Sequence, residues 1–361
     1  MKHNGVFSRC LVTSLFTLNL LVSLSVGFNE FELLVPKYDA VSDDARYDID
    51  AYVKSKFSKS CYEAKPGDLT ERILRPTADL KERDCAQRLP QAIIIGVRKC
   101  FSGRLLQFLR FHPSVEMRSD LVPLDLFSGA YDKTLELYRK QMPFTTKRQM
   151  TIEKTPEFFI VPHDVPKITH DLIDPNMKII AVVCDPVRRA IADYVRVKSD
   201  RDTSYSSIIG NTFEETVLQA EREGHVNHLN ALIDSGLYFK HFLRWLHYFP
   251  QEQMYLLDTK LLTIDPAKEM KKLENFLGLP PYFQESHFAV DEKGGHYCIV
   301  FPQKVCLQGT TKKQPKKPNV DDETLKTLYE FFAPYDRSLS DAFGQKLTWT
   351  DNKYNDDWTE H

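Results

Sequence analysis

The stretch that decides the fold runs from Pro90 to Pro113 and reads PQAIIIGVRKCFSGRLLQFLRFHP. An apolar run, residues 92–95, precedes Gly96 and a short turn of basic and small residues, 98–103. The apolar residues that follow recur at helical spacing: Leu105, Leu106, Phe108 and Leu109. This pattern predicts a buried parallel strand, a turn and a helix.

The turn has the chemistry of an anion-binding site. The N-terminus of a helix presents unpaired N–H groups and a partial positive charge, which attract phosphate or sulfate. Lys99 adds a full charge and Ser102 a hydroxyl group. Strand–turn–helix units with one lysine are also common as plain structure in α/β proteins, so the turn alone leaves both interpretations open.

The composition is that of an ordinary globular protein. The chain has 361 residues, of which 42% are hydrophobic and 27% charged, enough for one large α/β domain or two smaller ones. Its net charge of −2 excludes a global electrostatic attraction to a polyanion, so any basic surface must be local. We therefore expect no nucleic-acid partner.

Residues 1–27 predict a signal peptide or a retained signal anchor. Lys2 and Arg9 precede an apolar run, 11–28, that is close to the lower limit for a membrane span. Either alternative sends the rest of the chain into the secretory pathway. An anchor would be the chain's attachment to the membrane.

The remaining chain predicts a stem at 28–89, a globular domain at 90–350 and an acidic tail at 351–361. Further strands are predicted at 149–154, 177–183 and 254–257, and helices at 187–199, 229–249, 266–277 and, in broken form, 323–343. The alternation indicates an α/β domain with a parallel sheet. Because ligands bind at the carboxyl ends of such strands, the chain after Gly96 and after Val183 should line one cleft.

The cysteines predict disulfides in an oxidising compartment. Three pairs can form: Cys298 with Cys306 across a short loop, Cys61 with Cys85 as a second pair, and Cys100 with Cys184 as an alternative between two cleft residues. The spacings fit no zinc-binding pattern, so we expect no metal.

Together these segments resemble the heparan sulfate glucosamine 3-O-sulfotransferases over Leu89 to Trp349. The matching motifs are PQAIIIGVRK at 90–99, HP at 112–113, QMPF at 141–144, EKTP at 153–156, DPxxRxxxDY at 185–194, GLYxxHxxxW at 236–245, FP at 249–250, and HYC with CL at 296–307. The resemblance implies a P-loop-like sulfotransferase fold and a Golgi location. It also implies the sulfate donor PAPS (3′-phosphoadenosine 5′-phosphosulfate) and a heparan sulfate or heparin-like partner.

The family grips the donor's 5′-phosphosulfate with the turn after the first strand, using a Lys, a Gly-Gly pair and a Thr. The corresponding residues of this chain, 99–104, are called the donor loop here: Lys99, Cys100, Phe101, Ser102, Gly103 and Arg104. Ser102 can replace the Thr, but Cys100-Phe101 replaces the glycines. Since glycine lets the backbone approach a phosphate closely, the Phe101 ring must point away or obstruct the site.

The family grips the 3′-phosphate with an Arg and a Ser, which correspond to Cys184 and Ala192. Each lost charge-assisted hydrogen bond costs about 1.5–3 kcal/mol, so we expect weakened donor binding. Arg188 and Arg189 lie nearby in the sequence and could compensate.

The acceptor side is also altered. The family's catalytic Glu corresponds to Leu121, which has no titratable atom, and Asp120 is a weak substitute base. Lys154 matches a family lysine near the transferred sulfonate, so Lys99 and Lys154 carry the catalytic charge. Arg196 aligns with an acceptor-contacting Gln.

Two further contacts with the donor remain open. Tyr297 could stack on the adenine, as the family suggests, or pack beside the disulfide. Lys312 and Lys313 lie in the basic segment 310–318, where the family has a donor-binding turn, and could touch donor phosphate or heparan sulfate or form a solvated loop.

The sequence thus supports two functions. The first is a heparan sulfate 3-O-sulfotransferase that works slowly or with a rearranged base. The second is a non-catalytic relative that binds heparan sulfate or a protein partner. A nucleotide kinase is disfavoured because the chain lacks the G-x-x-x-x-G-K-[ST] pattern.

Overall fold

The computed structural model describes residues 48–118, 131–160, 164–199, 209–220, 222, 224–291, 297–306 and 318–350. The predicted leader and the acidic tail lie outside these residues, as does the first part of the predicted stem. None of the helices in the described ranges has both the length and the apolar character needed to cross a membrane.

A parallel sheet of five strands forms the centre of the molecule, in the order β5–β7–β4–β8–β9. Its strands are β4 (Ala92–Gly96), β5 (Val115–Met117), β7 (Met150–Lys154), β8 (Lys178–Val183) and β9 (Met254–Asp258). All of β4 and five of the six residues of β8 are buried, which explains their continuous apolar runs. The predicted parallel sheet is confirmed.

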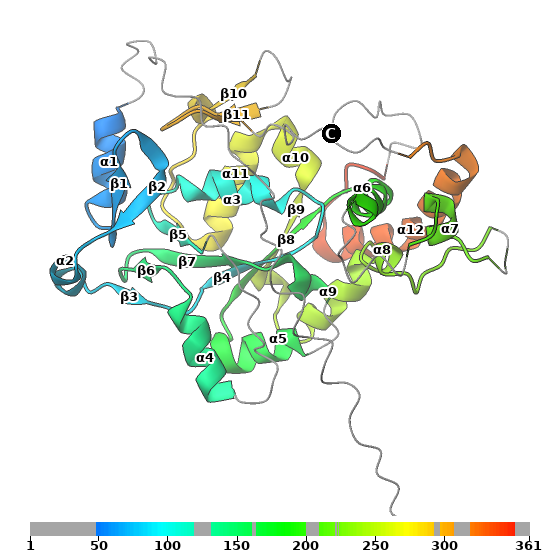
Figure 1. The fold of residues 1–361 in the computed structure, drawn as a ribbon, viewed down its shortest axis with the longest axis horizontal. Coiled ribbons are helices and arrows are strands. Elements are labelled where there is room, and N and C mark those ends of the chain that lie inside the picture. Colours follow the sequence, from blue (N-terminus) through cyan, green and yellow to red (C-terminus); the bar gives the residue numbers. More distant parts are fainter. Residues whose placement is uncertain are drawn as a thin grey trace, which may run out of the picture.

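Helices cover both faces of this sheet, with α3, α10 and α11 on one side and α4 and α5 on the other (Figure 1). The helices of the domain are α3 (Ser102–Arg110), α4 (Tyr131–Lys140), α5 (Val165–Ile168), α6 (Pro186–Ser199), α7 (Phe213–Val217), α8 (Ala231–Asp234), α9 (Tyr238–Leu246), α10 (Thr259–Ile264), α11 (Pro266–Leu277) and α12 (Asp322–Phe343). Shorter 3₁₀ or π turns are Pro156–Phe159, Thr169–Ile173, Gln251–Gln253 and Glu285–His287. The α/β fold class is therefore confirmed.

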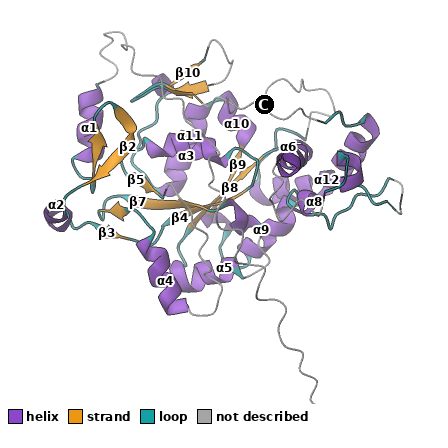
Figure 2. Cartoon of the chain, viewed as in Figure 1, coloured by secondary structure: helices purple, strands orange, loops and turns teal. Residues whose placement is uncertain are grey.

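Besides the pair of strands within residues 62–74, two small sheets lie outside this central band, and β10 lies beyond α10 and α11 (Figure 2). One pairs β3 (Ala86–Gln87) with β6 (Phe144–Thr145), and the other contains β10 (Phe288–Val290), β11 (Tyr297–Ile299) and β12 (Val305–Cys306). The predicted disulfide between Cys298 and Cys306 joins β11 to β12.

Two predicted helices differ from the structure. The expected helix 229–249 is divided into α8 and α9 at Gly236, where an added Cβ would lie 2.9 Å from the Phe332 ring. The expected break in the last helix is absent, because α12 runs through Pro334. Pro334 removes one backbone hydrogen bond from the helix. The burial of Leu328, Phe332 and Leu339 along α12 outweighs this loss and keeps the helix continuous.

The predicted stem differs from the structure from residue 48 onward. This part folds as α1 (Ile49–Phe57), β1 (Tyr62–Lys65), β2 (Asp68–Leu74), α2 (Thr77–Glu82) and β3. It packs on the domain, where the Tyr52 hydroxyl donates to the Phe111 carbonyl oxygen at 3.0 Å. Within the segment, the disulfide Cys61–Cys85 links the residues before β1 and β3. The globular unit therefore begins well before residue 90.

A buried polar cluster fixes this N-terminal part to the central sheet. The Glu116 carboxylate on β5 accepts hydrogen bonds from Ser60 and Gln149, each at 3.1 Å, and forms an ion pair with Arg72. Glu116 itself is fully buried. These long-range polar contacts leave no periodic signal in the sequence, which explains why the segment resembles a stem when it is considered alone.

Candidate active site

The strand order indicates where a binding crevice is expected, between the ends of β4 and β8. The chain leaves β4 through α3 toward β5 on one side, whereas β8 pairs with the other side of β4. Crevices of open α/β sheets form where the strand order reverses in this way, outside the carboxyl ends of the strands. The Val97 N–H donates to the Val182 carbonyl oxygen at 2.7 Å, so the two strand ends lie together as predicted.

The donor loop follows β4 in an alternating backbone conformation. Lys99 has a φ of +70° and Phe101 a φ of +56°, whereas Cys100 between them is not left-handed, and α3 begins at Ser102. Alternation of this kind turns successive N–H groups toward a common concave side, which suits an anion. Left-handed backbone costs a residue other than glycine roughly 1–2 kcal/mol, so other contacts must hold the loop.

A disulfide between Cys100 and Cys184 holds the donor loop against the end of β8. Their Cα atoms are 5.2 Å apart, and Cys100 is fully buried whereas Cys184 is partly exposed. This is the alternative pairing considered from the sequence, and the structure contains it. The disulfide thus joins two positions at which the resemblance implies a Gly and an Arg.

Two buried hydroxyl groups reinforce this link. The Tyr238 hydroxyl of α9 donates to the Cys184 carbonyl oxygen at 2.8 Å and lies 3.5 Å from the Cys100 sulfur. The Thr259 hydroxyl at the start of α10 lies 2.8 Å from the Cys100 carbonyl oxygen and 3.0 Å from that of Val183. No sequence pattern predicted these hydrogen bonds of Tyr238 and Thr259, although Tyr238 belongs to the GLYxxHxxxW motif.

The side chains of the loop are held by their neighbours. The Arg104 guanidinium lies over the Phe101 ring at 4.6 Å from its centroid, and burial lowers the Arg104 pKa. Ser102 is buried at the start of α3. Gly96 permits the close approach of the 3₁₀ turn Pro156–Phe159, which follows β7. A Cβ at Gly96 would lie 2.7 Å from the Phe159 Cβ.

The structure contradicts the suggestion that Arg189 compensates for the lost 3′-phosphate ligands. Arg189 is 1% exposed, pairs with Asp193 at 3.1 Å and donates to the Leu232 carbonyl oxygen. Asp193 also pairs with Arg98 at 2.9 Å. Burial opposes the charged form of Asp193, but the charges of Arg189 and Arg98 outweigh it and lower its pKa. Arg189 is therefore part of the interior.

Arg188, Ala192 and Arg196 share one side of α6, because residues four apart lie one above the other on a helix. Ala192 is exposed, and the two arginines on either side of it are partly exposed. The Arg188 Nε lies 3.7 Å from the carboxylate of Asp185, which caps α6 by accepting the Val187 and Arg188 N–H groups. Two cations therefore flank the position of the missing hydroxyl.

Lys154 lies at the end of β7, next to β4, and is partly buried. Its neighbour Glu153 is 1% exposed and accepts hydrogen bonds from the hydroxyls of Tyr138 and, at 2.8 Å, Thr155. Burial raises the pKa of Glu153 to about 7, against the opposing effects of the Thr155 hydrogen bond and the Arg118 charge. The sequence analysis missed this carboxyl group, although it stands in the quoted EKTP motif.

The structure does not describe all of the residues that the sequence singled out. Asp120, Leu121, Lys312 and Lys313 lie outside the described residues. Tyr297 is partly buried and packs against the main core. Asp291 lies close to Cys298 and Cys306, but these two sulfurs are bonded to each other and so offer no thiolate to a metal.

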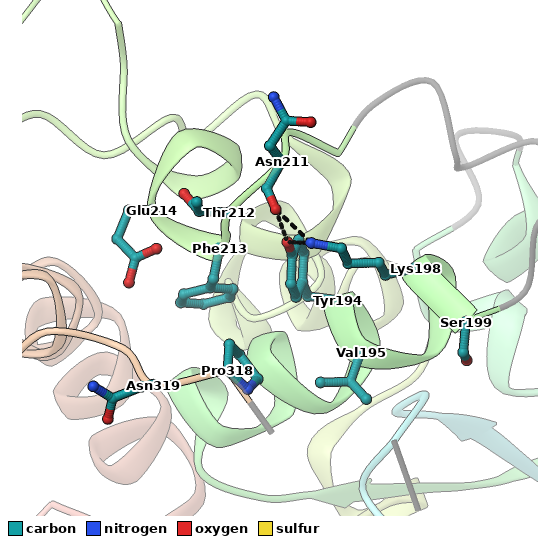
Figure 3. Close-up of a pocket in the computed structure, with 10 residues that line it drawn as sticks. All are labelled: Tyr194, Val195, Lys198, Ser199, Asn211, Thr212, Phe213, Glu214, Pro318 and Asn319. Atoms are coloured by element: carbon teal, nitrogen blue, oxygen red, sulfur yellow. Dashed lines mark hydrogen bonds between the residues drawn. The ribbon is translucent and has the colours of Figure 1, made fainter. Parts of the chain in front are cut away.

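A hollow of about 400 Å³ lies elsewhere along α6 (Figure 3). The Lys198 amine reaches across it, donating to the Tyr194 hydroxyl at 2.9 Å and to the Asn211 carbonyl oxygen. Among the residues that the structure describes, none of the predicted site residues lines this hollow.

Comparisons with known proteins agree with this geometry. The sulfotransferase domain family model matches residues 89–294. Heparan sulfate glucosamine 3-O-sulfotransferase 5 of Homo sapiens is 34% identical over 268 residues, which cover 74% of this chain and 75% of the relative. The chain belongs to the heparan sulfate glucosamine 3-O-sulfotransferase family.

One further relative and one solved structure also match. Heparan sulfate glucosamine 3-O-sulfotransferase 3B1 of Homo sapiens is 35% identical over 268 residues, covering 73% of this chain and 66% of the relative. Among solved structures, a sulfotransferase from Alicyclobacillus acidocaldarius matches with a TM-score of 0.49 and 19% identity, covering 73% of this chain and 99% of that one.

The Cys100–Cys184 disulfide links two positions that the resemblance aligns with donor-contacting residues of this family. The two sequence differences predicted from the resemblance therefore lie at one place in the structure.

Proposed function

We propose that the chain is a PAPS-dependent sulfotransferase that transfers a sulfonate group to glucosamine 3-hydroxyls of heparan sulfate, at a low rate. The observation that carries the proposal is the conformation of the donor loop. Its left-handed Lys99 and Phe101 precede α3 at the carboxyl end of β4, where an anion would meet several N–H groups.

The residues present fit the 5′-phosphosulfate half of the donor. Lys99 and Ser102 would contact its anionic oxygens, and Lys154 is the last residue of the neighbouring strand β7. Positive charge aimed at a leaving phosphate lowers the barrier of group transfer, because negative charge develops there in the transition state. This half of the site accounts for the proposed chemistry.

The residues fit the 3′-phosphate half less well. Ala192 offers no hydroxyl and the Cys184 sulfur is bonded to Cys100. Arg188 and Arg196, which flank Ala192 on α6, would supply the positive charge there. We therefore infer donor binding weaker than in relatives that have the Arg and Ser.

The general base and the cellular location complete the proposal. Asp120 would accept the proton of the 3-hydroxyl group. Glu153 is not assigned this role, because its carboxyl group is buried and does not reach solvent. The three disulfides suit an oxidising compartment, in keeping with a protein of the Golgi lumen that reaches it through its N-terminal leader.

A second function, non-catalytic binding of heparan sulfate or a protein partner, is favoured by the replaced residues Cys184 and Ala192. A labelled-sulfate transfer assay from PAPS to heparan sulfate separates the two. We expect slow incorporation at glucosamine 3-hydroxyls that Lys99→Ala abolishes. Heparin binding without any incorporation, together with no binding of 3′-phosphoadenosine 5′-phosphate, would instead support the non-catalytic function.

A further inference from the structure

We propose that the Cys100–Cys184 disulfide is a positioning clamp for the donor loop, so that a reductant that opens it weakens donor binding. The inference rests on the proposed function of this loop. In this proposal, donor binding depends on the redox state of the Cys100–Cys184 pair. A Gly and an Arg, which the resemblance implies at these positions, could not form such a bond.

The position of the disulfide supports a role at the site. It joins two strand ends that are adjacent in the sheet but 84 residues apart in the sequence, at the crevice between β4 and β8. The other two disulfides lie elsewhere: Cys61–Cys85 closes the N-terminal part, and Cys298–Cys306 joins two strands of a peripheral sheet. The chain thus contains a natural control for the effect of removing a disulfide.

The contacts around the clamp indicate what reduction would change. The hydrogen bonds from Tyr238 and Thr259 to backbone carbonyl oxygens do not require the S–S bond. They would keep α9 and α10 in place after reduction. Lys99 and Phe101, on either side of Cys100, would lose the covalent constraint on their unfavourable left-handed backbone. The donor would then have to order the loop on binding, which reduces affinity.

The reduction balances with a small thiol as the reductant. A thiolate attacks the sulfur of Cys184, the more exposed residue of the pair, and the S–S bond breaks with Cys100 as the leaving thiolate. A second thiol then releases Cys184. Two electrons and two protons pass to the protein, which gains two thiols, and the reductant becomes its own disulfide.

Calorimetric titration with 3′-phosphoadenosine 5′-phosphate tests the clamp. The full mature chain is compared with Cys100→Ser/Cys184→Ser and with the control Cys61→Ser/Cys85→Ser. We expect the dissociation constant to rise about tenfold in the first variant and less than about twofold in the control. An unchanged or lower dissociation constant in the first variant would overturn the proposal.

A second measurement serves if the double variant does not fold. The unmodified chain is titrated with dithiothreitol, and alkylation with mass spectrometry identifies which disulfide has opened. Affinity should fall in step with alkylation of Cys100 and Cys184, and full alkylation of this pair without loss of affinity contradicts the clamp. Absence of binding to the oxidised chain would refute the proposed donor site and the clamp together, whereas equal binding before and after reduction refutes the clamp alone.

Discussion

The carboxyl ends of β4 and β7 differ from that of β8 in the groups that they would offer to the donor. The first two carry Lys99, Ser102 and Lys154, the charged and hydroxyl groups that would contact the 5′-phosphosulfate in the proposed function. The end of β8 carries Cys184, which is bonded to Cys100, and Ala192 follows on α6. In the proposed function, the groups that bear on the chemistry are therefore present, whereas those that would add affinity for the 3′-phosphate are not.

Among the substitutions that test this comparison, Lys99→Ala should have the largest effect, which is on the rate of sulfonate transfer. Removing the charge next to the developing negative charge should lower the transfer rate at least about a hundredfold, or roughly 3–4 kcal/mol. The labelled-sulfate assay measures this. Lys81→Ala on α2, an exposed lysine outside the crevice, is the control, and equal rates for the two variants would remove Lys99 from the site.

Glu153→Gln tests the end of β7 through the pH dependence of stability. The folded-state pKa of Glu153 is about 7 against 4.5 for the free group, so the folded state binds the proton more tightly. Its contribution to stability is full below about pH 4.5 and is lost as the pH rises through 7, by up to about 3 kcal/mol.

Urea unfolding at pH 5 and pH 8 measures this difference. The wild type should lose stability between the two values, and Glu153→Gln should lose clearly less. Asp336, whose pKa burial also raises to about 7, remains in both proteins and should leave a residual slope. Identical slopes would mean that Glu153 titrates normally.

Thr259→Val sharpens the comparison at the end of β8. The variant leaves the carbonyl oxygens of Cys100 and Val183 without the hydroxyl, which should cost about 1–3 kcal/mol of unfolding free energy. Thr263→Val on the same helix is the control, since its hydroxyl bonds within α10 and is less buried. Equal losses would show that Thr259 has no special role.

Ala192→Ser has the smallest expected effect. It introduces the serine hydroxyl group that the family resemblance implies at this position. The new hydroxyl should strengthen binding of 3′-phosphoadenosine 5′-phosphate by about fivefold, or roughly 1 kcal/mol. Adenosine 5′-monophosphate, which lacks the 3′-phosphate, should bind equally to both proteins. Ala51→Ser, at an exposed position of α1, controls for the substitution itself. A gain for both ligands would place Ala192 away from the 3′-phosphate.

Sequence patterns predicted the elements whose signal is local. The strands at β4 and β8 are continuous apolar runs, and α11 has the predicted bounds because Pro266 begins it and Gly278 ends it. The division at Gly236 could not be predicted, since it depends on contact with Phe332 from a distant helix. The packing of residues 48–89 likewise depends on partners such as Glu116.

The candidate site was predicted in part for the same reason. Lys99 and Lys154 were singled out from motifs, and the structure places the strand that ends at Lys154 beside β4. The pairing of Cys100 with Cys184 stayed one alternative because two cysteines far apart in sequence do not reveal their distance. The buried role of Arg189 needed the position of Asp193 and the Leu232 carbonyl oxygen.

The central claim is that the 5′-phosphosulfate half of the donor site is retained and the 3′-phosphate half is not. Competition binding of 3′-phosphoadenosine 5′-phosphate, adenosine 5′-monophosphate and adenosine 3′-monophosphate tests it directly. Loss of the 3′-phosphate should weaken binding less than about tenfold, whereas loss of the 5′-phosphate should weaken it at least about a hundredfold. The reverse order, with the 3′-phosphate supplying most of the affinity, would contradict the account.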